Sequence, residues 1–254
     1  MRLRAVQFAI LAALIGLWHV LVRVDWLPRF FFGEPVAVGR RIVTWFVGGE
    51  IWSHLAVTLV ETVAAFFIGT AAGVTVGLWL GISPFAARVL DPYIKGLNAM
   101  PRVILAPIFA VWFGLGMTGK IVLGITLVFF VVFFSVFHGV RDVSPVIVAN
   151  ARMLGATRRG LLRHVYLPSA LSWAFASLHT AVGMAFVGAV VGEYLGSARG
   201  IGYLILQAEG TFDIDAVLAG VVVLTVCAVA LDRLVSMCES HLLRWRPNHH
   251  QQAV

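Results

Sequence analysis

Residues 121–137 read IVLGITLVFFVVFFSVF, an unbroken run without a charged side chain. A helix that crosses a hydrocarbon layer about 30 Å thick needs roughly 20 predominantly apolar residues. The composition of the whole chain also fits a lipid environment. Of its 254 residues, 60% are hydrophobic and 12% are charged, and the mean hydropathy is +0.94. Such a composition is too apolar for a water-soluble fold, so the stretch predicts a membrane-spanning helix.

Five further apolar stretches flank this one, at residues 5–22, 55–80, 97–113, 173–191 and 216–231. No small-residue cleavage site follows the first of them, which favours a span over a signal peptide. Residues 35–52 alternate apolar and charged side chains and predict a short surface helix. The sequence therefore predicts an all-α fold: a polytopic membrane helix bundle with about six transmembrane helices, forming one transmembrane domain over residues 1–254.

Positive charge is distributed unevenly over the two faces of such a bundle. Six spans place both termini on one side, and the positive-inside rule makes that side cytoplasmic. The cytoplasmic charges are then Arg2, Arg4, Arg88, Lys95, Arg141, Arg152, Arg158, Arg159, Arg163, Arg233, Arg244 and Arg246, against Arg23, Arg29, Arg40, Arg41, Lys120 and Arg199 outside. Topology and anionic inner-leaflet lipid therefore explain the net charge of +7, and no nucleic-acid partner is expected.

One hydrophilic stretch, residues 139–168, is long enough to dock a partner, and this topology makes it cytoplasmic. Ser144 is placed to cap a first helix that Gly155 ends. Thr157 is placed to cap a second helix, which Leu167-Pro168 would end before the fifth span. The pattern is helix, glycine bend, helix. From the residues alone it is either a docking element or an ordinary amphipathic loop at the membrane surface.

The spacing within this stretch resembles that of a known family. Ala149-Asn150-Ala151, three residues, Gly155, nine residues, Val165, one residue and Leu167-Pro168 resemble the EAA loop of binding-protein-dependent ABC importer permeases. From about Ser53 onward the chain looks similar to the nitrate, sulfonate and taurine group of these permeases. The resemblance implies a bacterial plasma (inner) membrane protein.

The resemblance also implies that this loop, the coupling loop, seats in a groove of a cytoplasmic ABC ATPase subunit. It assigns docking to Ala149, Asn150, Ala151, Arg152, Gly155, Ala156, Thr157, Arg158, Arg159, Leu167 and Pro168. The leading acid of the motif is Ala149 here, so we expect docking through shape, backbone contacts and the arginines.

Further partners follow from the same resemblance. It implies a second permease copy, as a homodimer, and an extracytoplasmic solute-binding protein. It also implies transport of a small polar solute by alternating access; a nitrate-, sulfonate- or taurine-type anion is favoured, and a pyrimidine-like solute is the alternative. The chain itself would be a non-catalytic subunit that binds no cofactor, with ATP and Mg acting in the ATPase. Residues 114–120 read G-x-x-x-x-G-K, but Ile121 replaces the Ser or Thr of a P-loop, and no strand precedes them. No metal site is expected, because the histidines and cysteines lack ligand spacing.

Several residues are candidates for lining the solute path, and each of them also has a purely structural interpretation. Pro101 and Pro107 would break the third span and free carbonyls for a water-filled path, or merely kink it. Ionisable groups at membrane depth usually face the bundle interior or water. These are Glu61, His179 and Glu193, with Arg102 near a span end, and each is a candidate for the path, for a gate or for a structural pair.

Glycines recur every four residues from Gly69 to Gly81, which favours close packing of the second span. A stand-alone secondary transporter or channel remains an alternative, although no internal repeat supports it. An intramembrane enzyme is a third option. The spans lack the Ser/His, His/Glu or paired-Asp spacing that it needs.

Overall fold

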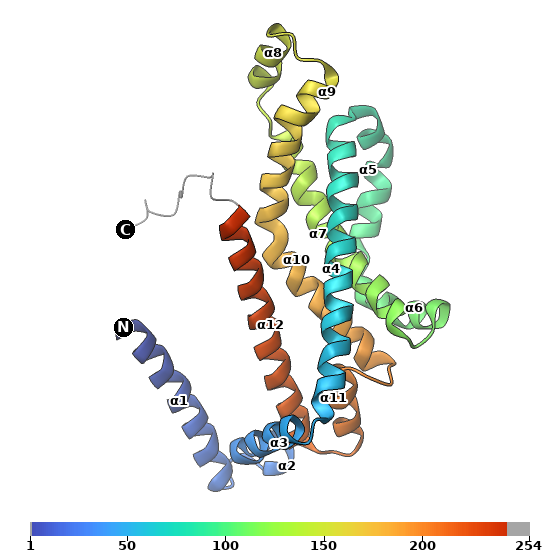
Figure 1. The fold of residues 1–254 in the computed structure, drawn as a ribbon. Helices are drawn as coiled ribbons and strands as arrows, with labels where there is room; N and C mark the ends of the chain where they lie inside the picture. Colours follow the sequence, from blue (N-terminus) through green and yellow to red (C-terminus); the bar gives the residue numbers. More distant parts are fainter. Residues whose placement is uncertain (1, 243–254) are drawn as a thin grey trace.

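The computed structural model describes residues 2–242, and within this range every regular element is a helix or helical turn (Figure 1). The α-helices are α1 (Arg2–Arg23), α2 (Arg29–Phe32), α3 (Pro35–Val47), α4 (Glu50–Ile82), α5 (Pro84–Ala99), α6 (Ala106–Phe113), α7 (Met117–Arg141), α8 (Pro145–Met153), α9 (Arg158–Leu161), α10 (Leu167–Leu195), α11 (Ile201–Gly210) and α12 (Ile214–Leu242). Arg244 and Arg246, counted above as cytoplasmic, lie outside the described residues.

Five helices of the described chain are long and apolar enough to cross a membrane, and a bent pair would make a sixth. The five lie at Ala5–Arg23, Glu50–Ile82, Met117–Arg141, Arg158–Leu195 and Ile214–Glu239. The prediction of an all-α, multi-pass bundle is therefore confirmed.

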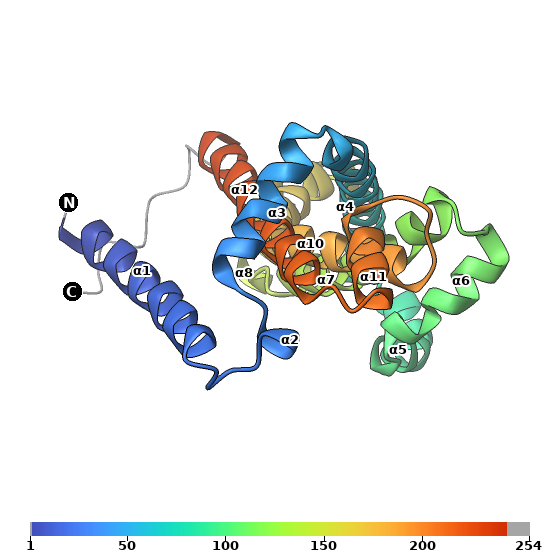
Figure 2. The same cartoon turned by 90° about the horizontal axis from the view of Figure 1, so that it is seen from below.

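Three helices, α4, α7 and α10, form the centre of the bundle (Figure 2). Their shared core consists of small and β-branched side chains, among them Ala65, Val132 and Ala181, each fully buried. The glycines of α4 face α7: a Cβ placed on Gly73 would lie 2.9 Å from the carbonyl oxygen of Phe129. The predicted close approach along this glycine seam is confirmed, because only a residue without a side chain leaves room for the neighbouring backbone.

A second cluster joins α3, α11 and α12 at the opposite end from α8 and α9 (Figure 1). Trp45 of α3 and Ala219 of α12 are buried in it. Polar contacts close its rim: Arg29 bonds Asp215 at 3.3 Å, and Arg41 pairs with Asp213. The surface helix predicted at residues 35–52 is thus real, but it ends at Val47, and residues 50–52 already belong to α4.

Helix α1 stands apart from the bundle, on the opposite side from α5 and α6 (Figures 1 and 2). It contacts the rest of the chain mainly through α3. Only 6% of the residues in its apolar stretch are buried. This helix therefore exposes nearly all of its apolar surface.

The predicted start of the third span at residue 97 was wrong, because the span begins at Pro84, but the interruption expected at its prolines is present. Helix α5 ends at Ala99, a 3-10 turn covers Arg102–Leu105, and α6 follows at an angle of 81° to α5. Pro101 causes the break, because it lacks an N–H and forces the preceding Met100 into an extended conformation. Pro107 breaks nothing; it lies in the first turn of α6, where a missing N–H leaves no bond unmade.

The chain enters α10 without the predicted stop at Leu167-Pro168. A π-helical turn, Leu162–Tyr166, joins α9 to α10, and Pro168 lies in the first turn of α10. The wider turn accommodates the proline, so α9 and α10 run on as one long helix. Ser144 does occupy the N-cap position of α8, but its side chain makes no capping bond.

Candidate coupling loop and transmembrane path

Helices α8 and α9 project beyond the ends of α7 and α10 (Figure 1). Of the residues predicted to dock, eight are exposed: Ala149, Asn150, Arg152, Gly155, Thr157, Arg158, Arg159 and Pro168. Ala151, Ala156 and Leu167 are half-buried. The structure thus brings most of the predicted set to one protruding, accessible element.

The bend between α8 and α9 follows from two residues that the sequence singled out. Gly155 has φ +85°, in the left-handed region where other residues are strained. The hydroxyl oxygen of Thr157 accepts the N–H of Gly160 at 3.2 Å and so caps α9. Without these two features the turn would lose its defined angle.

The bend also exposes large apolar side chains that the sequence reasoning missed. Met153 is 79% exposed and Leu154 is 89% exposed. On the same loop Val146 and Ile147 are also exposed. A cluster of exposed apolar side chains on a polar loop is typical of a protein-binding surface. The signal available in the sequence was a Met-Leu pair directly before a helix-ending glycine.

The arginines near the bend carry positive charge that no acid of the described chain pairs with. Within the described chain, none of Arg152, Arg158 and Arg159 forms an ion pair. Unpaired surface arginines remain free to bond carboxylates or backbone carbonyls of another protein.

The two ends of the coupling loop are tied to each other at the membrane. The Ser169 hydroxyl donates to the carbonyl of Gly139 at 2.8 Å, and the Ser135 hydroxyl donates to the carbonyl of Trp173 at 2.9 Å. The Trp173 ring lies where a side chain at Gly139 would be. The end of α7 and the start of α10 therefore form one braced pair, the α7–α10 clasp.

A buried charged network lies on the opposite half of the bundle, around Glu61. The Lys120 ammonium donates to Glu61 at 2.8 Å and to the Ser197 hydroxyl at 2.7 Å. The Lys120 and Glu61 side chains are 6% and 0% exposed. Lys120, which the predicted topology counts among the outer charges, is therefore buried inside the bundle beside Glu61.

Glu193 extends this network to α11. Its carboxylate accepts the Thr58 hydroxyl at 2.6 Å and the N–H of Gly202 at 2.8 Å. The Thr58 oxygen also accepts the N–H of Ile201 at 3.0 Å. Glu193 leaves no room for a side chain at Gly200, which has φ +117°. Glu61 and Glu193 thus lie in one network that holds α4, α7, α10 and α11 together.

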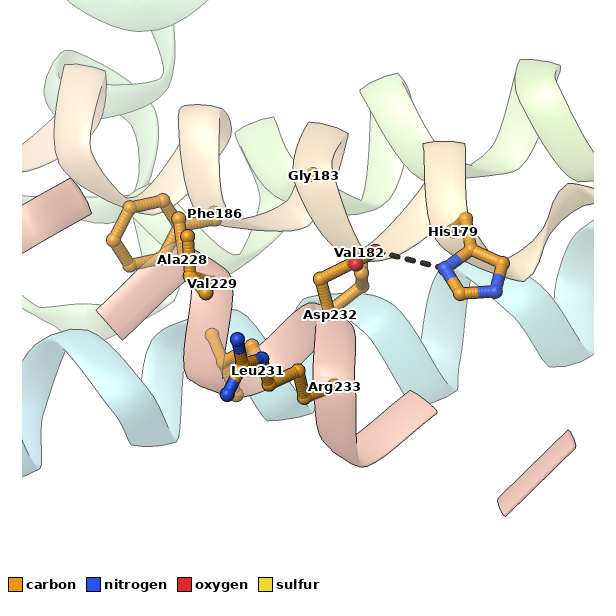
Figure 3. A pocket seen from close by; sticks show the side chains of 9 residues that line it. All are labelled: His179, Val182, Gly183, Phe186, Ala228, Val229, Leu231, Asp232 and Arg233. Carbon is orange, nitrogen blue, oxygen red and sulfur yellow. Dashed lines mark hydrogen bonds and ion pairs between the residues drawn. The ribbon is translucent and has the colours of Figure 1, made fainter. Parts of the chain in front are cut away.

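His179 lies away from this network, on the side of α10 that faces α12. Its ring nitrogens lie 2.7 Å from Asp232 and 2.9 Å from Glu239. Figure 3 shows Asp232 pointing at His179 beside a cavity of about 350 Å³ with an apolar wall formed by residues such as Phe186 and Val229. The structure therefore places His179 between two acids and separates it from Glu61 and Glu193.

Arg102 lies directly after the break in the third span. Its guanidinium donates to the side-chain oxygen of Asn98 at 2.6 Å and to the carbonyl of Asn98 at 3.2 Å. It also lies 4.5 Å from the centre of the Phe130 ring on α7. These contacts hold the cation against the bundle beside the broken helix.

The helical bundle with its candidate spans defines a multi-pass membrane protein, and the protruding two-helix loop is a surface that a soluble partner could reach. Residues 69–244 match the family described as "Binding-protein-dependent transport system inner membrane component". The chain belongs to this family, and it is the transmembrane permease subunit of an ABC uptake transporter.

Named relatives match almost the whole chain. The putative aliphatic sulfonates transport permease SsuC of Bacillus subtilis is 29% identical over 94% of this chain and 86% of its own length. The taurine transport system permease TauC of Escherichia coli is 30% identical over 92% of this chain and 87% of its own length. Among solved structures, an inward-facing MetNI methionine ABC transporter shares the fold, with a TM-score of 0.63 and 20% identity over 79% of this chain and 95% of its own.

Proposed function

We propose that this chain forms, as one transmembrane domain paired with a second copy, the path of an importer for small organic anions of the sulfonate type. The coupling loop seats in a cytoplasmic ATPase subunit, where ATP and Mg act, and a solute-binding protein delivers the solute from outside. The chain itself has no catalytic role and binds no cofactor. Alternating access follows when ATP draws the two coupling loops together.

The observation that carries the docking proposal is the exposed, structured bend of the coupling loop. Leu154 and Met153 at its tip would be costly to leave in water, and a partner groove would bury them. The arginines around the tip supply polar contacts at the rim of that interface, where Ala149 offers no acid. The apolar tip and basic rim together match a groove with an apolar floor and acidic or carbonyl edges.

The orientation in the membrane is part of the same proposal. The basic residues Arg152, Arg158 and Arg159 mark the coupling-loop side as cytoplasmic by the positive-inside rule. In Figure 1, the N-terminal end of α1 and the C-terminal end of α12 both point toward that side. Both termini are therefore assigned to the cytoplasm.

We infer the class of solute from the names of the relatives. The permeases SsuC and TauC carry aliphatic sulfonates and taurine in their names. Both solutes present a sulfonate oxyanion on a short alkyl chain. We therefore assign a small organic sulfonate as the solute, with the first discrimination made by the binding protein.

The test is affinity capture of the tagged chain from native membranes in mild detergent. We compare the wild type with Gly155→Asp and Leu154→Glu, and use Val47→Glu as the matched control. Val47 is 84% exposed and Leu154 is 89% exposed, but Val47 ends α3 at the opposite end of the bundle. An ATPase subunit is expected with the wild type and the control, and at least about tenfold less of it with the two loop variants.

Two results would contradict the proposal. If no ATPase accompanies the wild type even after crosslinking, the chain works without one. If the loop variants retain the ATPase as well as Val47→Glu does, docking occurs elsewhere on the chain.

A further inference from the structure

The break between α5 and α6 leaves irregular backbone at membrane depth. Helix α5 has 16 residues, so at 1.5 Å per residue its end lies about 24 Å from the α4–α5 turn. Met100 and Pro101 are both extended there, with ψ 132° and 92°. Lipid offers no hydrogen-bond partners, so such backbone persists only against protein or beside water.

The described chain does not cover this break. Leu97 is 54% exposed, Ile104 is 68% exposed, and Pro101 is exposed as well. Because lipid is excluded as the neighbour, this face must look onto a second protein chain or a water-filled space. In the importer proposed above, both conditions hold where two copies enclose the solute path.

Arg102 brings a positive charge to this face without a matching negative one. Its partners, the carbonyl and amide oxygens of Asn98 and the ring of Phe130, are all neutral. Within the described chain it forms no ion pair, whereas two other cations of the spans are paired, Lys95 with Asp91 and Lys120 with Glu61. An uncompensated arginine at this depth attracts an anion.

The geometry also prepares the guanidinium for an oxyanion. Asn98 and Phe130 restrict it from two sides, which reduces the entropy lost when a ligand binds. A guanidinium presents several donors in a planar fork that matches oxyanion oxygens in pairs. The neighbouring Leu97 and Ile104 supply apolar contact for a short alkyl chain.

We propose that Arg102, held by Asn98 and Phe130 at the broken third span, is a contact point for the anionic group of the solute as it crosses the membrane. This inference rests on the proposed function, because it requires that the solute be an anion and that the face of α5 and α6 line the path. It adds a specificity-determining residue that lies within the membrane, in addition to the binding protein.

The test uses the complete transporter, with its ATPase and binding protein, in proteoliposomes and with ethanesulfonate as the solute. The variants are Arg102→Gln, Arg102→Lys and Asn98→Ala, with Arg88→Gln as the matched control. Arg88 lies near the start of α5, away from the break, and like Arg102 it donates to the carbonyl four residues earlier, at 3.3 Å. Both uptake and the ATP hydrolysis stimulated by loaded binding protein are measured, after gel filtration confirms intact complexes.

Arg102→Gln is expected to lower ethanesulfonate uptake at least tenfold, about 1.4 kcal/mol, with stimulated ATP hydrolysis within twofold of wild type. Arg102→Lys keeps the charge and is expected to retain more uptake than Arg102→Gln. Asn98→Ala is expected to lose less uptake than Arg102→Gln does. Arg88→Gln is expected to match the wild type. The inference is refuted if Arg102→Gln transports normally, or if it loses hydrolysis and uptake together, since coupling rather than solute contact then fails. A wild-type complex that hydrolyses ATP but moves no sulfonate would instead refute the proposed substrate class, and this inference with it.

Discussion

Replacing Gly73 by alanine tests the glycine seam between α4 and α7. The added Cβ would lie 2.9 Å from the Phe129 carbonyl oxygen, 2.9 Å from the Val132 Cβ and 3.0 Å from the Phe133 nitrogen. Two of these contacts are to backbone, which cannot rotate away as a side chain can. Helices α4 and α7 must therefore separate, and we expect a loss of about 1–3 kcal/mol from overpacking.

Gly183→Ala on α10 is the matched control. Nothing lies within 4 Å of a Cβ at Gly183, so this variant gains only the helix preference of alanine, roughly 0.5–1 kcal/mol. Both variants gain that preference. The difference between their stabilities therefore isolates the packing cost of the seam.

The assay is thermal unfolding of the purified protein in one detergent. We expect Gly183→Ala to have the highest Tm, the wild type an intermediate Tm and Gly73→Ala the lowest. A difference of 1 kcal/mol corresponds to roughly 2–4 °C in Tm for a chain of this size. Equal Tm values for the two variants would show that α4 and α7 do not pack as closely as described. The double variant Gly73→Ala/Gly77→Ala should lose less than the sum of the single losses, because one separation of the helices accommodates both methyl groups.

Three further predictions concern polar groups. Lys120→Met leaves the buried Glu61 without its cation and should cost about 3–5 kcal/mol; Lys120→Met/Glu61→Gln should recover part of that loss, as measured by the yield of monodisperse protein, and a double variant as poor as the single one would contradict the pairing. Thr157→Val removes the α9 cap, worth about 1 kcal/mol, and should speed amide exchange at Gly160 while leaving the exchange of α4 unchanged. Asp232→Asn removes the acid 2.7 Å from His179, but both side chains are partly exposed, so Tm should fall by no more than a degree or two; a larger fall would mean that the pair supports the fold.

Patterns along the sequence predicted much of this fold because their causes are local. A long run of apolar residues selects a membrane helix whatever surrounds it, and glycines four apart share one helix face. The Gly155 bend and the Thr157 cap likewise depend on residues within one turn of each other. These features could therefore be read from the chain alone.

Other features depend on residues far apart in the sequence, and these were missed. Lys120 is buried only because Glu61, 59 residues earlier, lies opposite it. The position of a proline indicates a constraint but not how the chain resolves it. Pro101 breaks a span, Pro107 starts a helix, and Pro168 is accommodated by a π-helical turn before it.

The α7–α10 clasp has a mechanical consequence. Because Ser169 and Ser135 bind the two roots of the coupling loop together, those roots resist separation when a force is applied to α8 or α9. In the proposed importer, a pull on the tip of the loop would therefore tilt α7 and α10 together as one body. Helix α4, pressed against α7 along the glycine seam, must follow that tilt. In the proposed importer, a small displacement of the coupling loop would thereby reach the opposite end of the bundle.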